Sequence, residues 1–452
     1  MGTQSINSLL LSMSIPMIIS MLVQALYNIV DTMFVSKLGQ DALTALSLAF
    51  PVQNLLIAVS VGTGVGVNAL LSRSLGEKNF NRANATANNG IYLSFVSAFI
   101  VMILGFVAVK PYFESFGSSE NVIKLGTKYL SICMIASYGL FGQVMFEKLL
   151  QSTGKTVLSM AVQLSGAIIN IVLDPILING YWIFPRLGVT GAALATVIGQ
   201  LASMCIGLVI NCRYNKEITL SLRGVVKPDK EVIKKIYSVG IPSICMASIG
   251  SVMTVAMNQI MRIFDAATAA TGQAVFGVYF KLQSFVFMPV FGLNNGMVPI
   301  VAYNFGAKNK DRIKKTITLS VIYACSMMAL GLLAFQIFPE PLLRIFDTGD
   351  DDMKKIIEIG IPMLRSISLS FVLAGYCIVA GSVFQALGHG MRSLVVSVCR
   401  QLVILVPVAF LLAYMTKNIG VMWLSFPIAE IFSLTMSILF MRKTYKNEIN
   451  IL

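Results

Sequence analysis

The sequence has few charged residues. Only 12% of its 452 residues are Asp, Glu, Lys or Arg, whereas a soluble domain carries about 25%. Hydrophobic residues make up 56% of the chain, and the mean hydropathy is +0.80. A chain of this length could not cover a water-soluble fold with so little polar surface. The scarcity of charge therefore indicates that lipid surrounds most of the chain.

Residues that carry enzyme chemistry are also scarce. The single histidine, His389, lies between two glycines, and the glycine-rich stretch 62–66 is not followed by the Gly-Lys-Ser/Thr of a phosphate-binding loop. The cysteines form no Cys-x-x-Cys pair and are interpreted as packing residues of apolar segments: Cys133, Cys205, Cys212, Cys245, Cys325, Cys377 and Cys399. We therefore expect no enzyme activity, no cofactor and no ATP site, and an ion gradient as the driving force of any transport.

Long apolar runs are what the sequence has in abundance. About 20 apolar residues in a helix cross the hydrocarbon core of a bilayer. Twelve segments of this length are predicted to span the membrane: residues 9–36, 46–74, 88–109, 124–152, 157–180, 187–212, 232–264, 273–304, 314–338, 355–387, 391–415 and 419–441. The predicted fold class is an all-α integral membrane protein with twelve transmembrane helices.

The basic residues predict the orientation of these helices. The net charge is +14, and Lys and Arg gather in alternate loops, such as 213–235 and 308–315, and in the tail 442–446. The other loops are poorer in basic residues and include the acidic run 347–352. By the positive-inside rule the basic loops and both termini are cytoplasmic. We expect a multi-pass protein of the bacterial inner (cytoplasmic) membrane, and a charge that reflects orientation and not nucleic-acid binding.

The two halves of the sequence resemble each other. A shift of 230 residues aligns Phe50-Pro-Val-Gln53 with Phe280-Lys-Leu-Gln283, Gly62 with Gly292, Gly66 with Gly296, and Gly76-Glu-Lys-Asn79 with Gly306-Ala-Lys-Asn309. Such a constant offset predicts duplication, with an N-lobe of residues 1–212, a cytoplasmic linker of residues 213–231 and a C-lobe of residues 232–452. Parallel repeats of this kind are typical of transporters that bind substrate between their halves. We interpret the glycines as sites of close helix packing.

Polar residues inside the first-half spans share helix faces. Gln24, Asn28 and Asp31 lie at i, i+4 and i+7 of the first span, Asn170 and Asp174 at i and i+4 of the fifth, and Thr196 and Gln200 at i and i+4 of the sixth. A carboxylate at the middle of the bilayer costs a few kcal/mol, so its partners are expected nearby. Hard oxygen donors suit Na⁺, and two neighbouring carboxylates suit a proton carrier. Hydrogen bonding between helices is the alternative role for Asn170 and Thr196. Helix capping or a loop contact is the alternative for Asp174, which precedes Pro175 near a predicted helix end.

The second half lacks these ionisable groups. Met257 stands at the position that matches Asp31, and Val408 roughly at that of Asp174. Arg400 and Glu430 are polar residues inside second-half spans, and a structural ion pair between them is one reading. The sequence therefore predicts a coupling site in the first half, with the second half contributing cavity wall.

Several segments resemble the MATE family of multidrug and toxin extruders, most of all its DinF-like branch with the MepA-type exporters. They are Ile15-Pro16, the run from Gln24 to Val35, residues 75–79, the run from Gly166 to Pro175, residues 191–196 and residues 301–308. The resemblance implies a MATE/MOP-type fold of two pseudo-symmetric six-helix lobes. It also implies antiport of cationic, amphipathic drugs against H⁺ or Na⁺.

For individual residues, the resemblance makes Asp31 the principal coupling carboxylate, places Asn170, Asp174 and Thr196 around it and makes Pro16 the hinge of the first helix. Na⁺ would then bind at Asp31, Asn170, Asp174 and Thr196, with Gln24, Asn28 and Gln200 lining the cavity beside them. A cation site in the C-lobe is not expected, because residues 248–251 lack the glutamate that another branch of the family carries there.

Two other functions are weighed against this one. A flippase for lipid-linked precursors would belong to the same superfamily, but it is expected to have more spans and a cationic cavity. A membrane enzyme would need a catalytic set that the sequence does not offer. The expected partners are small organic cations and membrane lipid, and a monomer is expected because a single chain can complete the pathway.

Overall fold

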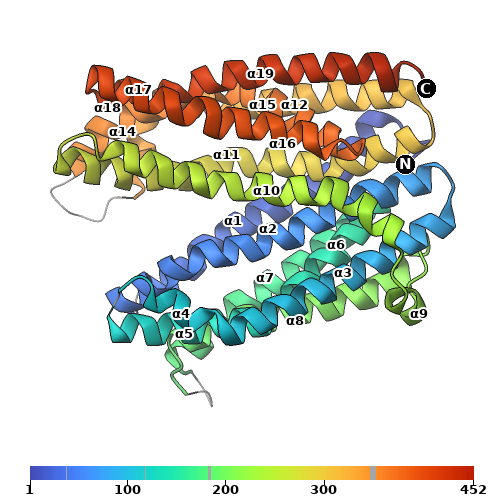
Figure 1. Ribbon diagram of the computed structural model, residues 1–452, viewed down its shortest axis with the longest axis horizontal. Coiled ribbons are helices and arrows are strands. Elements are labelled where there is room, and N and C mark those ends of the chain that lie inside the picture. Colours follow the sequence, from blue (N-terminus) through green and yellow to red (C-terminus); the bar gives the residue numbers. More distant parts are fainter. Residues whose placement is uncertain (37, 118, 182–184, 347–352) are drawn as a thin grey trace.

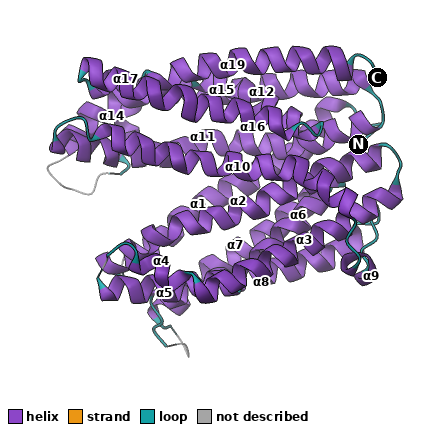
Figure 2. Ribbon diagram, in the orientation of Figure 1, coloured by secondary structure: helices purple, strands orange, loops and turns teal. Residues whose placement is uncertain are grey.

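The computed structural model describes residues 1–36, 38–117, 119–181, 185–346 and 353–452. The side chains of residues 28–33, 35, 36 and 353 are not described. The acidic run 347–352 therefore lies outside the described residues, as do the side chains of Asn28 and Asp31. Every described regular element is a helix (Figure 2).

Helices α1 to α8 form a first bundle, which the short helix α9 follows (Figure 1). Their bounds are α1 Ile6–Ser36, α2 Gln40–Gly76, α3 Phe80–Val107, α4 Val109–Glu114, α5 Glu120–Ile135, α6 Tyr138–Ser152, α7 Thr156–Asn179, α8 Val189–Tyr214 and α9 Leu222–Val226. Some helices begin well before the predicted spans, as α3 does at Phe80 instead of residue 88, because polar residues cap them in the loops. Asn79, for example, accepts a hydrogen bond from the backbone N–H of Arg82 at the start of α3.

Helices α10 to α19 form a second bundle (Figure 1). Their bounds are α10 Lys230–Met261, α11 Ala266–Gly306, α12 Lys310–Ile337, α13 Pro339–Arg344, α14 Met353–Ser368, α15 Phe371–Ala386, α16 Gly390–Val398, α17 Val406–Thr416, α18 Ile419–Met422 and α19 Ser425–Thr444. Two π-helical segments, η1 Cys399–Leu405 and η2 Tyr445–Ile449, continue α16 and α19.

The predicted spans are present, but two of them are not single straight helices. Among the described residues ten helices are long and apolar enough to cross a membrane, and up to twelve if each bent pair counts as one span. The span predicted at 124–152 is α5 and α6, which meet at 45°, and the span predicted at 355–387 is α14 and α15, which meet at 50°. Hydropathy does not detect such bends, because a break of two residues leaves the apolar content unchanged.

The cysteines only partly match their predicted role. Cys133 and Cys377 are buried, whereas Cys205, Cys212 and Cys245 lie on the exposed surface of the helices. For these three the expectation of a packing residue was wrong, since an apolar segment in a membrane protein can turn its side chains to lipid as well as to the core.

The two bundles meet at one end of the molecule and diverge toward the other (Figure 1). Both chain termini lie at the end where they meet. Helix α1, the first helix of the first bundle, packs along α11 of the second bundle. Helix α10, the first helix of the second bundle, packs along α2 of the first. The start of α1, with Leu10 and Met13, belongs to the hydrophobic core of the second bundle, while Ile236 of α10 belongs to a core of the first.

Glycines at matching positions make these crossings close. A Cβ on Gly62 would lie 2.5 Å from Ile244 Cγ1 of α10. A Cβ on Gly66 would lie 2.2 Å from the carbonyl oxygen of Ile236 on the same helix. A Cβ on Gly292 would lie 2.6 Å from Ile18 Cα, and one on Gly296 2.5 Å from Ser14 Oγ, both on α1. The Ser14 hydroxyl also donates a hydrogen bond of 3.2 Å to the Leu293 carbonyl. The glycines repeated in the sequence are thus contacts between the bundles.

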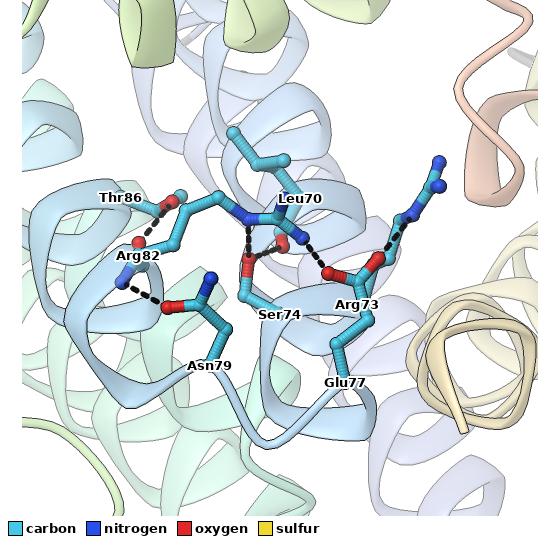
Figure 3. A network of polar contacts seen from close by, with 7 residues as sticks. All are labelled: Leu70, Arg73, Ser74, Glu77, Asn79, Arg82 and Thr86. Carbon is cyan, nitrogen blue, oxygen red and sulfur yellow. Dashed lines mark hydrogen bonds and ion pairs between the residues drawn. The ribbon is translucent and has the colours of Figure 1, made fainter.

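The loop between α2 and α3 is held by a network of polar contacts (Figure 3). The Arg82 guanidinium donates to Ser74 Oγ at 2.9 Å and pairs with Glu77, and Arg73 Nε donates to Glu77 Oε1 at 2.9 Å. The loop between α11 and α12 repeats this arrangement. There Arg312 Nε donates to Asn304 Oδ1 at 3.0 Å, and Lys308 has the same φ of 56° as Lys78.

We expect Arg82→Ala to destabilise the protein by about 1 kcal/mol, the upper range for a partly buried ion pair with an added hydrogen bond. The cause is the loss of the contacts to Ser74 and Glu77. Thermal unfolding of the purified protein in detergent measures the effect. Lys110→Ala is the control, because its pair with Glu114 is 3.7 Å long and exposed, and it should change stability by less than about 0.5 kcal/mol. Equal melting temperatures for the two variants would contradict this role of the network.

Candidate functional site

Asn170 and Asp174 lie one turn apart on α7 and are buried, with 3% and 0% of their surface exposed. Asp174 precedes Pro175, but α7 continues to Asn179 and ends at Gly180, whose φ of 76° is left-handed. Asp174 is therefore inside the helix, and the capping role considered for it from the sequence was wrong. Burial of a carboxylate in a membrane-spanning helix is costly, which makes Asp174 the centre of the candidate site.

Thr196 of α8 contacts Asn170. The Asn170 side-chain Nδ2 donates to Thr196 Oγ1 at 3.2 Å, and the Thr196 hydroxyl in turn donates to the Ala192 carbonyl at 3.1 Å. The close approach of the two helices allows this contact, because a Cβ on Gly199 would lie 2.8 Å from the carbonyl oxygen of Gly166. Within the described residues, buried Asn170 Oδ1 accepts no hydrogen bond. That oxygen is a suitable ligand for a cation.

Gln24 of α1 and Gln200 of α8 have different surroundings. Gln24 Oε1 accepts a hydrogen bond of 3.1 Å from Gln163 Nε2. This bond joins α1 to α7 at a point two turns before Asn170 in the sequence of α7. Gln200 packs against α6, because a Cβ added to Gly139 of α6 would lie 3.1 Å from the Cβ of Gln200. Gln24 thus lies on the α7 side of the bundle with the candidate site, whereas Gln200 lines the contact with α6.

Asn28 and Asp31 belong to α1, but their side chains lie outside the described part of the structure, so their place in the site stays a prediction. Pro16 is described. It is buried within α1, between the two points at which Ser14 and Ile18 contact α11. A proline interrupts helix hydrogen bonding. A bend of α1 at Pro16 would therefore start from a segment that is fixed against the second bundle.

The second bundle differs at the equivalent positions. Met257 is fully buried in α10. Arg400, in the π-helical segment η1, lies beside Glu430 of α19 with Nη1 and Oε2 3.4 Å apart. The ion pair considered from the sequence is therefore present. Groups of three or more His, Cys, Asp and Glu residues that could hold a metal ion do not occur among the described residues.

Sequence reasoning missed several polar residues of the first bundle. Gln163 and Ser159 continue the face of Asn170 along α7, and Glu147 and Lys148 are buried in α6 with 7% and 5% exposed. Following the helix face of Asn170 and Asp174 by two further turns, or seven residues, toward the start of α7 would have found Gln163. Glu147 and Lys148 gave a weaker signal, because they lie near the predicted end of a span.

Two bundles of membrane-spanning helices that join at one end, with the fully buried Asp174 in the first, are typical of a multi-span membrane transporter. The MatE family model matches residues 16–176 and 242–411, one stretch in each bundle. The chain belongs to the MatE family, whose members are transporters and not enzymes.

The chain is similar to named relatives along nearly its whole length. It is 28% identical to the FAD transporter of Shewanella oneidensis, over 94% of this chain and 92% of that one. It is also 28% identical to the multidrug export protein MepA of Staphylococcus haemolyticus, over 94% and 91%. A solved structure of a MATE family transporter in an outward-facing conformation superposes with a TM-score of 0.91 at 24% identity, over 98% and 96%. That likeness establishes the MATE fold.

Proposed function

We propose that this protein exports cationic, amphipathic small molecules from the cell in exchange for H⁺ or Na⁺. The observation that carries the proposal is the complete burial of Asp174 beside the Asn170–Thr196 contact. Burying an acidic group in a membrane-spanning helix is costly, and a bound cation or a proton would offset that cost. Asp31, Asn170, Asp174 and Thr196 would hold the coupling ion, and Gln24 and Asn28 would line the cavity beside it.

Coupling requires that the ion and the substrate favour different conformations. In the structure the bundles are in contact at the end that carries both termini. If this end is cytoplasmic, as the basic loops predict, the substrate is released on the opposite side. Ion binding at the site would then bend α1 at Pro16 and weaken substrate binding, and the lobes 1–212 and 232–452 would rock about the linker. The pathway lies within one chain, so we propose a monomer in the bacterial inner membrane.

Efflux from proteoliposomes tests this proposal. The purified protein is reconstituted, a fluorescent cationic dye is supplied, and a pH gradient and a Na⁺ gradient are imposed separately. We expect dye movement against its own gradient when a pH gradient, a Na⁺ gradient or each of them is imposed, and none when both gradients are absent. Dye movement that ignores both gradients would contradict coupled antiport.

The nature of the substrate is tested in the same vesicles. One relative is named for FAD and another for multidrug export, so flavin adenine dinucleotide serves as the competing anionic substrate. Inhibition of dye efflux by organic cations and not by the flavin supports the proposal, and the reverse would assign an anionic substrate. A lipid-linked precursor flippase is not favoured, because the buried ionisable residue of the candidate site is acidic.

A further inference from the structure

Polar residues continue from the candidate site toward the end where the bundles meet. On α7, Asp174, Asn170, Gln163 and Ser159 are separated by four, seven and four residues, which places them on one helix face. Ser159 and Asp174 are 15 residue steps apart, about 22 Å at the rise of an α-helix. Gln163 bonds to Gln24, and Ser159 Oγ accepts a hydrogen bond of 3.1 Å from Gln151 Nε2 of α6. The face is thus hydrogen-bonded at several levels.

Helix α6 presents a second polar face beside it. Gln143, Glu147 and Gln151 lie at i, i+4 and i+8. Gln143 Nε2 donates to Glu147 Oε1 at 2.9 Å. Glu147 is only 7% exposed, and within the described residues no basic group lies within 4.0 Å of its carboxylate. Burial of a carboxylate this deep is costly, and a bound cation would offset more of that cost than the single hydrogen bond from Gln143 does.

The next residue, Lys148, is near enough to Glu147 for their opposite charges to attract each other, but their charged atoms are not within 4.0 Å of each other. Its Nζ donates to Gln151 Oε1 at 2.9 Å and to Asn295 Oδ1 of the second bundle at 3.0 Å. The lysine stem passes over Gly64 of α2, where a Cβ would lie 2.7 Å from Lys148 Cγ. Lys148 therefore connects the bundles, and its bond to Asn295 must break when they separate at this end.

Other charged residues of the helices that pack around α6 interact with groups other than Glu147 or are exposed. Arg73 of α2 and Arg82 of α3 pair with Glu77. Arg213 of α8 is exposed, and Lys281 of α11 lies over the ring of Phe346. Asp174 of α7 belongs to the candidate site. Lys148 is thus the charged side chain nearest to Glu147 along α6.

We propose that Glu147 is a second cation-accepting carboxylate of the first bundle. It receives the coupling cation from the Asp174 site and releases it to the cytoplasm after Lys148 has left Asn295. While the bundles are in contact, the Lys148–Asn295 bond keeps this exit closed. The inference rests on the proposed function, because it assigns the release step of the same antiport cycle.

The test compares net efflux with substrate exchange in proteoliposomes of the full chain. Net efflux requires release of the coupling cation, whereas exchange of dye for dye across the membrane without a gradient uses the substrate-loaded carrier alone. We expect Glu147→Gln to slow gradient-driven efflux about tenfold or more while exchange stays within about twofold. The matched control is Glu430→Gln, which removes a carboxylate of similar burial in the second bundle and should leave the ratio of the two rates unchanged.

Wild-type net efflux in Glu147→Gln would overturn the inference, and so would an equal loss of efflux and exchange. If Glu147→Gln does not fold, Gln143→Leu decides, because it removes the hydrogen bond to Glu147 and keeps the carboxylate. A selective loss of net efflux in that variant supports the inference, and an unchanged ratio overturns it. Absence of any gradient response in the wild-type protein would instead contradict the proposed function itself.

Discussion

Asp31→Asn is expected to abolish gradient-driven efflux while leaving the protein expressed and folded. An aspartate at mid-membrane costs about 2.5 to 3.5 kcal/mol on insertion scales, and every 1.4 kcal/mol is a factor of about ten. Removing the charge therefore shifts the balance between ion-loaded and ion-free states by about two orders of magnitude. A variant that behaves as permanently loaded cannot use the gradient.

The measurement is dye efflux from proteoliposomes under the ion gradient that drives the wild type. Asp41→Asn is the control, because Asp41 lies at the exposed start of α2, where its Oδ2 accepts a hydrogen bond of 2.6 Å from Asn121. The control should keep efflux. Near-normal efflux by Asp31→Asn would rule out the role assigned to this residue.

Gly292→Ala is expected to weaken the contact between the bundles by about 1 to 3 kcal/mol, the usual cost of overpacking a tight site. Helix propensity alone would favour alanine by about 1 kcal/mol. The steric cost exceeds this gain, because the new Cβ would lie 2.6 Å from both the nitrogen and the Cα of Ile18, backbone atoms that cannot move aside independently. The conformation with the bundles in contact should therefore be less populated.

Distances between spin labels on the two bundles measure that population, and thermal unfolding measures stability. Gly277→Ala is the control in the same helix, because a Cβ there meets no atom within 4 Å. It should be neutral or slightly stabilising. If Gly292→Ala and Gly277→Ala gave the same distances and melting temperatures, the close crossing of α1 and α11 would not be important for holding the bundles together.

Much of the architecture could be predicted from composition and from the repeat. Apolar runs long enough for a bilayer predict spans whatever their neighbours are, because each helix satisfies its own backbone hydrogen bonds in lipid. The offset that aligned Gly62 with Gly292 also predicted which residues would allow close packing. It could not identify the partners of these glycines. The lobe boundaries at residues 212 and 232 stay a prediction, as does the place of Asp31 in the site.

The sequence by itself determined that this is a helical membrane protein with an internal duplication, and it placed Asp31 and Asp174 within spans of the first half. Only the tertiary structure decided that α1 packs on α11, that α5 and α6 bend at 45°, and that Lys148 reaches Asn295 across the bundles. The physical reason is the distance along the chain over which each signal acts. Hydropathy and helix periodicity act within one segment, whereas these features depend on which helix faces come together after the segments have formed.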